Sequence, residues 1–300
     1  MEFFDADAIR ARYRQFEPQP PRLVTRFAPS PTGHLHLGHV LHAEWVWGAA
    51  RALDARVVIR MEDHDRSRCR PEFERSILKD LRWLGFQPDA ISLNSLQRAD
   101  SGCRQSSHPR RYQAAFDRLR TVTGVYGCIC TREMMAPVGT DGERRYAGTC
   151  RGQPIERDRP AVLRAQLPDD AVPIEDLRHG SLVQHPQRDR GDVAVRDARG
   201  QWTYQFSVVV DDLHDGVNLV VRGDDLLPST GTQRLLARLL GHTGEAFTIH
   251  HPLVRDATGH KLSKRDSSET VQELRRSGLS AVEVRRRAQA AVGGGAPVTS

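Results

Sequence analysis

Residues 22–39 read RLVTRFAPSPTGHLHLGH, and this stretch decides the fold. Its first part, residues 22–28, predicts a short strand that the proline- and glycine-containing turn at residues 29–33 ends. A helix is expected from Gly38 onward, because apolar residues recur there at helical spacing, namely Val40, Ala43, Trp47 and Ala50. A strand that passes through a sharp turn into a helix is typical of the first unit of a parallel α/β domain.

The rest of the chain continues this alternation. Further strands are expected at residues 55–61, 205–212, 217–222 and 248–251, and further helices at residues 71–84 and 230–240. Residues 128–159 are instead rich in glycine, arginine and turn-forming residues, which indicates an inserted subdomain. The pattern predicts an α/β fold with parallel-sheet character on both sides of the insertion.

The composition is that of a folded protein with a polyanionic partner. The 300 residues exceed one typical domain, and 38% are hydrophobic while charges of both signs are interspersed. The net charge of +6 favours a partner such as nucleic acid. No apolar run approaches the ~20 residues that cross a bilayer, and the polar N-terminus is unlike a secretory signal. We therefore expect a cytoplasmic protein without a membrane partner.

Two short elements favour phosphate chemistry. His36, Gly38 and His39 stand at the expected helix start, where backbone amides attract phosphate and histidines can donate hydrogen bonds to it. Residues 261–265 read KLSKR and hold Lys261 and Lys264, whereas Lys79 is the only other lysine. Lysine is a mobile point charge that suits a departing pyrophosphate. Ordinary surface histidines and a solvated basic loop are the alternatives when each element is taken singly.

In this order, the two elements resemble the signatures of class I aminoacyl-tRNA synthetases. The wider context, from about residue 22 to 279, resembles the glutamyl-tRNA synthetase group through residues 26–39, 60–65, 204–212, 221–227 and 261–265. The resemblance implies a Rossmann-type catalytic domain, interrupted by an insertion that binds RNA. It also implies activation of L-glutamate by ATP, with Mg²⁺, and transfer of the glutamyl group to tRNA. Catalysis and ATP binding would fall to His36, His39, Lys261 and Lys264, with Gly38 in the ATP site.

The resemblance further implies an amino-acid pocket, made by Arg26, Phe27, Ala28, Pro29, Ser30, Glu62, Tyr204 and Arg222. The chemistry agrees, because glutamate carries two carboxylates and one ammonium group. Arg26 and Arg222 can supply two guanidinium groups and Glu62 one counter-charge, while Tyr204 offers a hydroxyl. An ordinary set of structural ion pairs is the alternative interpretation.

The cysteines form a third element. An odd total of five, with one C-x-C pair, favours metal or free thiols over a disulfide framework. Cys128, Cys130, Tyr146 and Cys150 could close a tetrahedral zinc site, and the glutamyl group places C-x-C and Y-x-x-x-C in its insertion. Reduced cysteines without a metal are the alternative, while Cys69 and Cys103 receive no assignment.

Only some thirty-five residues follow Arg265, so we expect no anticodon-binding domain. This short form resembles the glutamyl-queuosine tRNA(Asp) synthetases, a paralogous family that attaches glutamate to the modified anticodon base. The implied partner is tRNA(Asp) that contains queuosine, bound by a monomer. The alternatives are a truncated glutamyl-tRNA synthetase that charges the tRNA 3′ end, a non-catalytic RNA-binding paralogue and a plain zinc-binding module.

The expected division of the chain follows from these elements. It comprises an N-terminal extension (1–21), the first half of the catalytic domain (22–107), the inserted zinc and acceptor-binding subdomain (108–195), the second catalytic half (196–255), the lysine loop with a helical segment that contacts the RNA stem (256–292) and a disordered tail (293–300).

Overall fold

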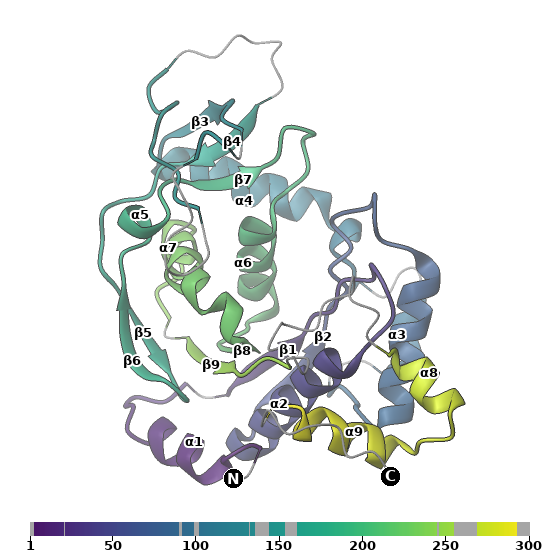
Figure 1. Ribbon diagram of the computed structural model, residues 1–300. Helices are drawn as coiled ribbons and strands as arrows, with labels where there is room; N and C mark the ends of the chain where they lie inside the picture. The colour runs from purple at the N-terminus through teal and green to yellow at the C-terminus, as the bar shows by residue number, and fades with distance from the viewer. Residues whose placement is uncertain are drawn as a thin grey trace.

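The computed structural model describes residues 3–20, 22–89, 92–98, 102–131, 133–135, 144–153, 161–244, 246–254 and 269–292. Its centre is a sheet to which two separate parts of the chain contribute (Figure 1). Strands β1 (Val24–Phe27) and β2 (Arg56–Ile59) pair in parallel, as do β8 (Leu219–Gly223) and β9 (Phe247–His251). The Asn218 amide donates to the Val24 carbonyl at 3.1 Å, so β1 lies beside β8.

Helices cover both faces of this sheet. In Figure 1, α2 (Leu37–Leu53) and α9 (Ala281–Ala290) lie below the sheet, and α6 (Tyr204–Asp215) and α7 (Thr230–Leu239) lie above it. The remaining helices are α1 (Ala6–Tyr13), α3 (Pro71–Leu84), α4 (Pro109–Val122), α5 (Pro186–Asp189) and α8 (Val271–Arg276), with 3₁₀ turns at Ser95–Gln97, Gln105–Ser107 and Asp224–Ser229. This layered arrangement is the α/β fold that the sequence predicts.

Most of the predicted elements are confirmed. The strands expected at residues 55–61, 217–222 and 248–251 correspond to β2, β8 and β9. The helix expected at residues 71–84 is α3, which begins at a proline and ends before Gly85. Gly85 has a φ of 83°, a left-handed conformation that favours glycine.

The strand predicted at residues 205–212 is wrong, because these residues lie in α6. Thr203 caps this helix by accepting from the Phe206 amide, and Gly216 ends it with a φ of 68°. Residues 206–211 are all buried, since α6 packs against α4, α7 and strand β7 (Val193–Arg196). A helix that is buried all round reads as a continuous apolar run, which periodicity cannot distinguish from a buried strand.

The middle of the chain contributes to two sheets. Strands β3 (Val125–Cys128), β4 (Val162–Ala165) and β7 (Val193–Arg196) form an antiparallel sheet at the top of Figure 1. By contrast, β5 (Val172–Asp176) pairs in parallel with β9 and in antiparallel with β6 (Gly180–Gln184). Two strands from the stretch 108–195 therefore extend the central sheet, and Asp176 comes to lie beside β9.

The N-terminal extension packs on the catalytic part of the chain. Phe3 and Phe4 lie edge-on against Trp45 of α2, and this contact holds α1 against α2.

Among the described residues, no helix has both the length and the apolar character to span a membrane.

Candidate active site

The two signature histidines cap the N-terminus of α2. The Gly38 amide donates to His36 Nδ1 at 3.1 Å, and the His36 amide donates to His39 Nδ1 at 3.2 Å. Because each Nδ1 accepts a backbone hydrogen, each neutral ring carries its proton on Nε2. A Cβ on Gly38 would lie 3.0 Å from the His36 ring, so glycine keeps this turn uncrowded. The site thus offers two Nε2–H donors beside a helix N-terminus, which suits a phosphate group.

The stretch that contains Lys261 and Lys264 lies outside the described residues, but both of its flanks are placed. On one side, His251 at the end of β9 lies 3.0 Å from His42 of α2, between Nε2 and Nδ1. On the other side, Thr270 forms a β-bridge with His36, and the Val271 amide donates to the Leu35 carbonyl at 2.8 Å. Residues 255–268 are therefore bounded by two anchors on α2.

Four of the predicted pocket residues come together where β1 and β8 end. Arg26 lies in β1, Arg222 in β8, Glu62 follows β2 and Tyr204 begins α6. Their charges influence one another, since both arginines and Glu62 act on the pKa of Tyr204, which burial mainly raises. The adjacent strands β1 and β8 are each followed by a segment that turns to a different face, and such a switch point is where α/β sheets bind ligands.

Arg222 is the cation without a counter-charge in this group. Arg222 is only 4% exposed, and it bonds to the Tyr204 hydroxyl and to three further neutral groups. These are His250 Nε2 at 3.0 Å, Gln233 Oε1 at 2.5 Å and Thr230 Oγ1 at 2.7 Å. No carboxylate in the described part of the chain forms an ion pair with it. A buried guanidinium in this state is prepared for an anionic ligand.

On the other side of the pocket, carboxylates outnumber the guanidinium groups that pair with them. Arg60 lies 2.7 Å from Asp212, 2.9 Å from Asp215 and 3.5 Å from Glu62. Asp212 also pairs with Arg26 at 3.2 Å, and Arg111 lies 2.9 Å from Asp211. Arg26, Arg60 and Arg111 thus face Glu62, Asp211, Asp212 and Asp215, which leaves one negative charge in excess. Such an excess favours an ammonium group as ligand.

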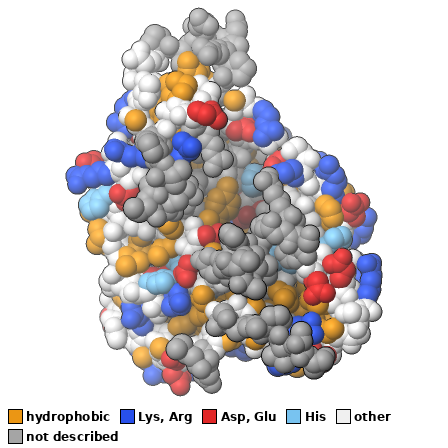
Figure 2. Space-filling model, viewed as in Figure 1, with side chains coloured by type: hydrophobic (Ala, Val, Ile, Leu, Met, Phe, Trp, Pro, Cys, Tyr) orange, Lys and Arg blue, Asp and Glu red, His pale blue; other side chains and the backbone are white. Residues whose placement is uncertain are grey.

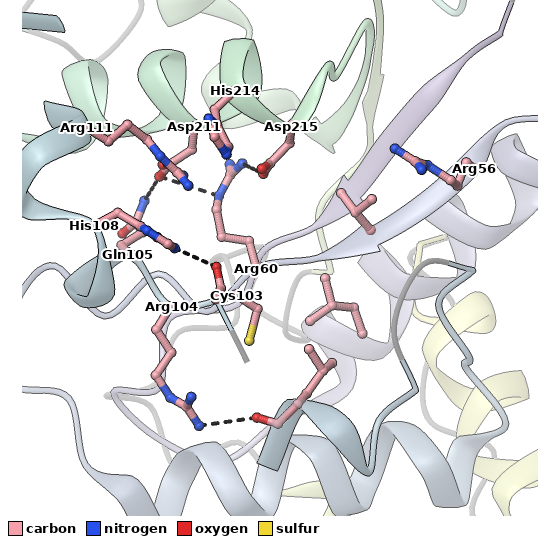
Figure 3. Close-up of a pocket in the computed structure, with 14 residues that line it drawn as sticks. Arg56, Arg60, Cys103, Arg104, Gln105, His108, Arg111, Asp211, His214 and Asp215 are labelled. Carbon is pink, nitrogen blue, oxygen red and sulfur yellow. Dashed lines mark hydrogen bonds and ion pairs between the residues drawn. The ribbon is translucent and has the colours of Figure 1, made fainter. Parts of the chain in front are cut away.

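The pKa values follow this distribution of charge. Burial raises the pKa of Glu62, although Arg60 and Arg26 oppose it. Burial acts in the same direction on Asp212, but Arg26 and Arg60 outweigh it and hold its pKa below the ordinary value. Of these two carboxylates, Glu62 is therefore the one whose charge the neighbouring arginines compensate less. Behind Arg60 lies a cavity of about 280 Å³, lined also by Asp211, Asp215 and Arg111 (Figure 3).

The other predicted pocket residues form the turn after β1. The Phe27 side chain is buried in the core against the His42 ring, with centroids 5.3 Å apart, so only its backbone can face a ligand. Ala28 is partly exposed. The Pro29 carbonyl accepts from the Glu62 amide at 3.1 Å, and the Ser30 carbonyl accepts from the Thr32 amide at 2.8 Å. These bonds hold the turn against Glu62.

The three predicted cysteine ligands lie together. The sulfur atoms of Cys128, Cys130 and Cys150 are all within 4.8 Å of one another. Zinc bound at about 2.3 Å from each sulfur needs separations of roughly 3.8 Å, so this donor set fits the ion. The Tyr146 hydroxyl is close by, where it accepts from the Cys150 amide at 2.9 Å. Cys69 and Cys103 lie elsewhere, next to Glu62 and Met61 respectively.

The surface around the site is hollowed. Figure 2 shows a depression near the centre of this face, with hydrophobic and acidic side chains visible inside it. Lys and Arg side chains are scattered over the surrounding surface of this face instead of forming one patch. Two arginines of the inserted region are engaged internally, Arg111 with Asp211 and Arg151 with Asp192.

The comparisons agree with this geometry. The profile of the family described as tRNA synthetases class I (E and Q), catalytic domain, matches residues 22–284. The chain belongs to this family. It is 39% identical over 276 residues to the glutamyl-Q tRNA(Asp) synthetase of Nitratidesulfovibrio vulgaris, which covers 86% of this chain and 83% of the relative. It is 36% identical over 286 residues to the protein of the same name from Rhodobacter capsulatus, with 88% and 99% covered.

The fold is also similar to solved structures of glutamate–tRNA synthetases. The glutamate–tRNA synthetase of Elizabethkingia anophelis is 26% identical, with a TM-score of 0.66. A glutamate–tRNA ligase of Elizabethkingia meningosepticum, solved in complex with its amino acid, has a TM-score of 0.65. Each similarity covers 86% of this chain but 54% and 53% of the solved chains, so this chain spans about half of their length.

Proposed function

We propose that this protein activates L-glutamate with ATP and transfers the glutamyl group to the queuosine base of tRNA(Asp). The observation that carries the glutamate assignment is the buried Arg222 without a described counter-charge, opposite a cluster with one carboxylate in excess. An amino acid with a second carboxylate satisfies both sides at once. The acceptor is supported by the names of the relatives that match over most of their own length.

In the proposed reaction, a carboxylate oxygen of glutamate attacks the α-phosphorus of ATP and pyrophosphate leaves. The Nε2–H groups of His36 and His39 donate to the phosphate oxygens as negative charge develops on them. Lys261 and Lys264 neutralise the departing pyrophosphate, and Mg²⁺ that accompanies ATP shields the phosphate charge. A hydroxyl of the queuosine ring then attacks the glutamyl carbonyl, and AMP leaves.

In the proposed amino-acid pocket, different residues bind the negative and the positive groups of glutamate. Arg222 and Arg26 bind carboxylate groups of glutamate, although Arg26 is already held by Asp212. Glu62, whose charge is less compensated than that of Asp212, binds the ammonium group. Tyr204 and the turn from Phe27 to Ser30 complete the pocket by a hydroxyl and by backbone groups. Each of these roles is part of the proposal.

The acceptor is tested by supplying radiolabelled glutamate and ATP with two preparations of tRNA(Asp). We expect label on tRNA(Asp) that contains queuosine and none on an unmodified transcript, because the transcript lacks the cyclopentenediol hydroxyls. An unmodified tRNA(Glu) transcript is the control for 3′ charging. Label on that transcript, which contains no queuosine, would contradict the proposed acceptor and favour a truncated glutamyl-tRNA synthetase.

We also propose a structural zinc ion held by Cys128, Cys130, Cys150 and Tyr146. The purified protein is expected to contain about one zinc per chain, as measured by mass spectrometry of the metal. Cys150→Ala should remove the metal, because only two thiolates remain, and should lower the unfolding temperature by about 2–4 °C for each kcal/mol lost. Cys69→Ser, outside the cluster, should retain the zinc. Full zinc content in the Cys150 variant would refute this site.

A further inference from the structure

His250 connects Arg222 to a buried carboxylate in a part of the chain that was expected to be an insertion. His250 lies in β9, directly opposite Arg222 of β8 in the strand register. Its Nε2 lies 3.0 Å from Arg222 Nε, and its Nδ1 lies 2.6 Å from Asp176 Oδ2 of β5. His250 and Asp176 are fully buried, and Arg222 is 4% exposed. The three groups span three adjacent strands of the central sheet.

The direction of each hydrogen bond follows from the donors available. An ionised carboxylate only accepts, so Nδ1 of His250 must carry the proton that bonds Asp176. An arginine only donates, so Nε2 of His250 must accept from Arg222 and the ring is neutral. Asp176 is itself fixed, since it accepts from the amides of Arg178 and His179 at 3.0 and 2.8 Å and from Thr248 Oγ1 at 2.9 Å.

We propose that Asp176 and His250 are positioning residues, which set the orientation of Arg222 for the carboxylate of the substrate. This inference rests on the proposed function, in which Arg222 binds glutamate. A guanidinium has five N–H groups. His250, Gln233 and Thr230 take one each and Tyr204 bonds to the same guanidinium, which leaves at least one N–H for a ligand. Gln233 is oriented in turn by Gln205, whose side-chain oxygen accepts from it at 2.8 Å.

A neutral imidazole suits this position better than a carboxylate would. A carboxylate beside Arg222 would fix the guanidinium but would also neutralise it and compete with the carboxylate of the ligand. His250 instead accepts one hydrogen bond and leaves the positive charge of Arg222 available. Asp176 fixes the ring by accepting a hydrogen bond from Nδ1 of His250. Metal-binding histidines are often oriented in the same way, by a carboxylate on the ring nitrogen that does not bind the metal.

The arrangement makes the pocket sensitive to acid. The titratable or charged groups around His250 are Asp176 on β5, Arg222 on β8, Asp224 after β8 and Arg178 after β5, which donates to the His250 carbonyl at 3.1 Å. Burial is the main cause that lowers the pKa of His250, with Arg222 acting in the same direction and Asp176 against it. A proton on Nε2 would face the Arg222 N–H and displace it. Above the ordinary histidine pKa, His250 is neutral and glutamate binds with full affinity. This affinity is lost as the pH falls through the pKa of His250 in the folded protein, which is lower than the ordinary value.

The test compares His250→Leu and His250→Gln with wild type by glutamate-dependent exchange of pyrophosphate into ATP. The leucine leaves a buried donor of Arg222 unpaired, so the KM for glutamate should rise about 10- to 100-fold while the KM for ATP stays within about twofold. Glutamine can present an oxygen to Arg222 and does not titrate. It should recover most of the glutamate affinity and abolish the loss of affinity in acid.

Thr123→Val is the matched control, because it removes a hydrogen bond, to the Gln166 carbonyl, that lies outside the chain of contacts from Asp176 through His250 to Arg222. It should lower the unfolding temperature but leave the KM for glutamate unchanged. Equal KM values and equal pH profiles in wild type and both His250 variants would overturn the positioning role alone. A wild-type protein that exchanges no pyrophosphate with glutamate would overturn the proposed function and this inference with it.

Discussion

Arg222→Gln should raise the KM for glutamate by about 10²–10³-fold, because removing one partner of a buried charged pair costs roughly 2–5 kcal/mol. The effect should be large here because Arg222 is buried and has no described carboxylate of its own. Without ligand, the wild-type cation is costly to bury, and glutamate supplies its counter-charge. The measurement is glutamate-dependent pyrophosphate exchange over a range of glutamate concentrations, with the KM for ATP as internal reference.

Two comparisons separate binding from folding in this experiment. Arg222→Lys keeps the charge but loses the planar set of donors that His250, Gln233 and Thr230 hold, so it should be impaired to an intermediate degree. The folded glutamine variant should unfold at a temperature no lower than wild type, because it no longer buries an uncompensated charge. A KM for glutamate that stays within threefold of wild type would remove Arg222 from the pocket.

His36→Asn and His39→Ala should each lower kcat for adenylate formation by about 10²–10³-fold, the usual loss when one donor to a developing charge is removed. Asparagine at position 36 is an informative replacement, because its side-chain oxygen can still cap α2 at the Gly38 amide. It lacks the Nε2–H that faces away from the cap. A folded protein with low kcat and an unchanged KM for glutamate is therefore the expected outcome, measured by single-turnover formation of adenylate.

His34 provides the neighbouring control. It belongs to the same turn, but its Nδ1 lies 2.8 Å from the Ser76 hydroxyl and it does not cap α2. His34→Asn should retain a kcat within about threefold of wild type, because its half-buried ring contacts Ser76 and Phe73 and not the start of α2. An equal loss of kcat in the His34 and His36 variants would mean that activity depends on the packing of this turn and not on the Nε2–H of His36.

The sequence predicted the parts of the fold and site that depend on local order. The turn at residues 29–33, the helix that follows it and strands β2, β8 and β9 all carry local signals of spacing or of turn residues. The position of His36 and His39 at the start of α2 also follows from local sequence signals, since a helix start can be read from the sequence. The secondary structure of residues 205–212 could not be predicted in this way. The helix is buried on most sides, so its sequence lacks the polar face that usually marks a helix.

The residues that support the pocket were missed for a different reason. Arg60 and Asp212 lie in stretches that the sequence singled out, but their pairing joins positions far apart in the chain. Asp176 carried no signal, because it stands in a segment that was expected to belong to an insertion and reaches His250 only through the pairing of β5 with β9. One indication was available, since charged residues within buried strands such as Arg60 and Arg222 require buried partners.

The two anchors of residues 255–268 on α2 have a kinetic consequence. His42 and His36 are six residues apart on or beside one helix, which places the anchors only ~9 Å apart along its axis. In the proposed function, the tethering of this stretch at both ends would supply Lys261 and Lys264 to the phosphate groups at an effective concentration of about millimolar or more, as short tethers do. Because the entropy of closing such a loop grows only with the logarithm of its length, inserting several residues before Lys261 should dilute the lysines only slightly. Cutting the chain at the same point would leave the lysines tethered on one side only, through Thr270 and the helices that follow it.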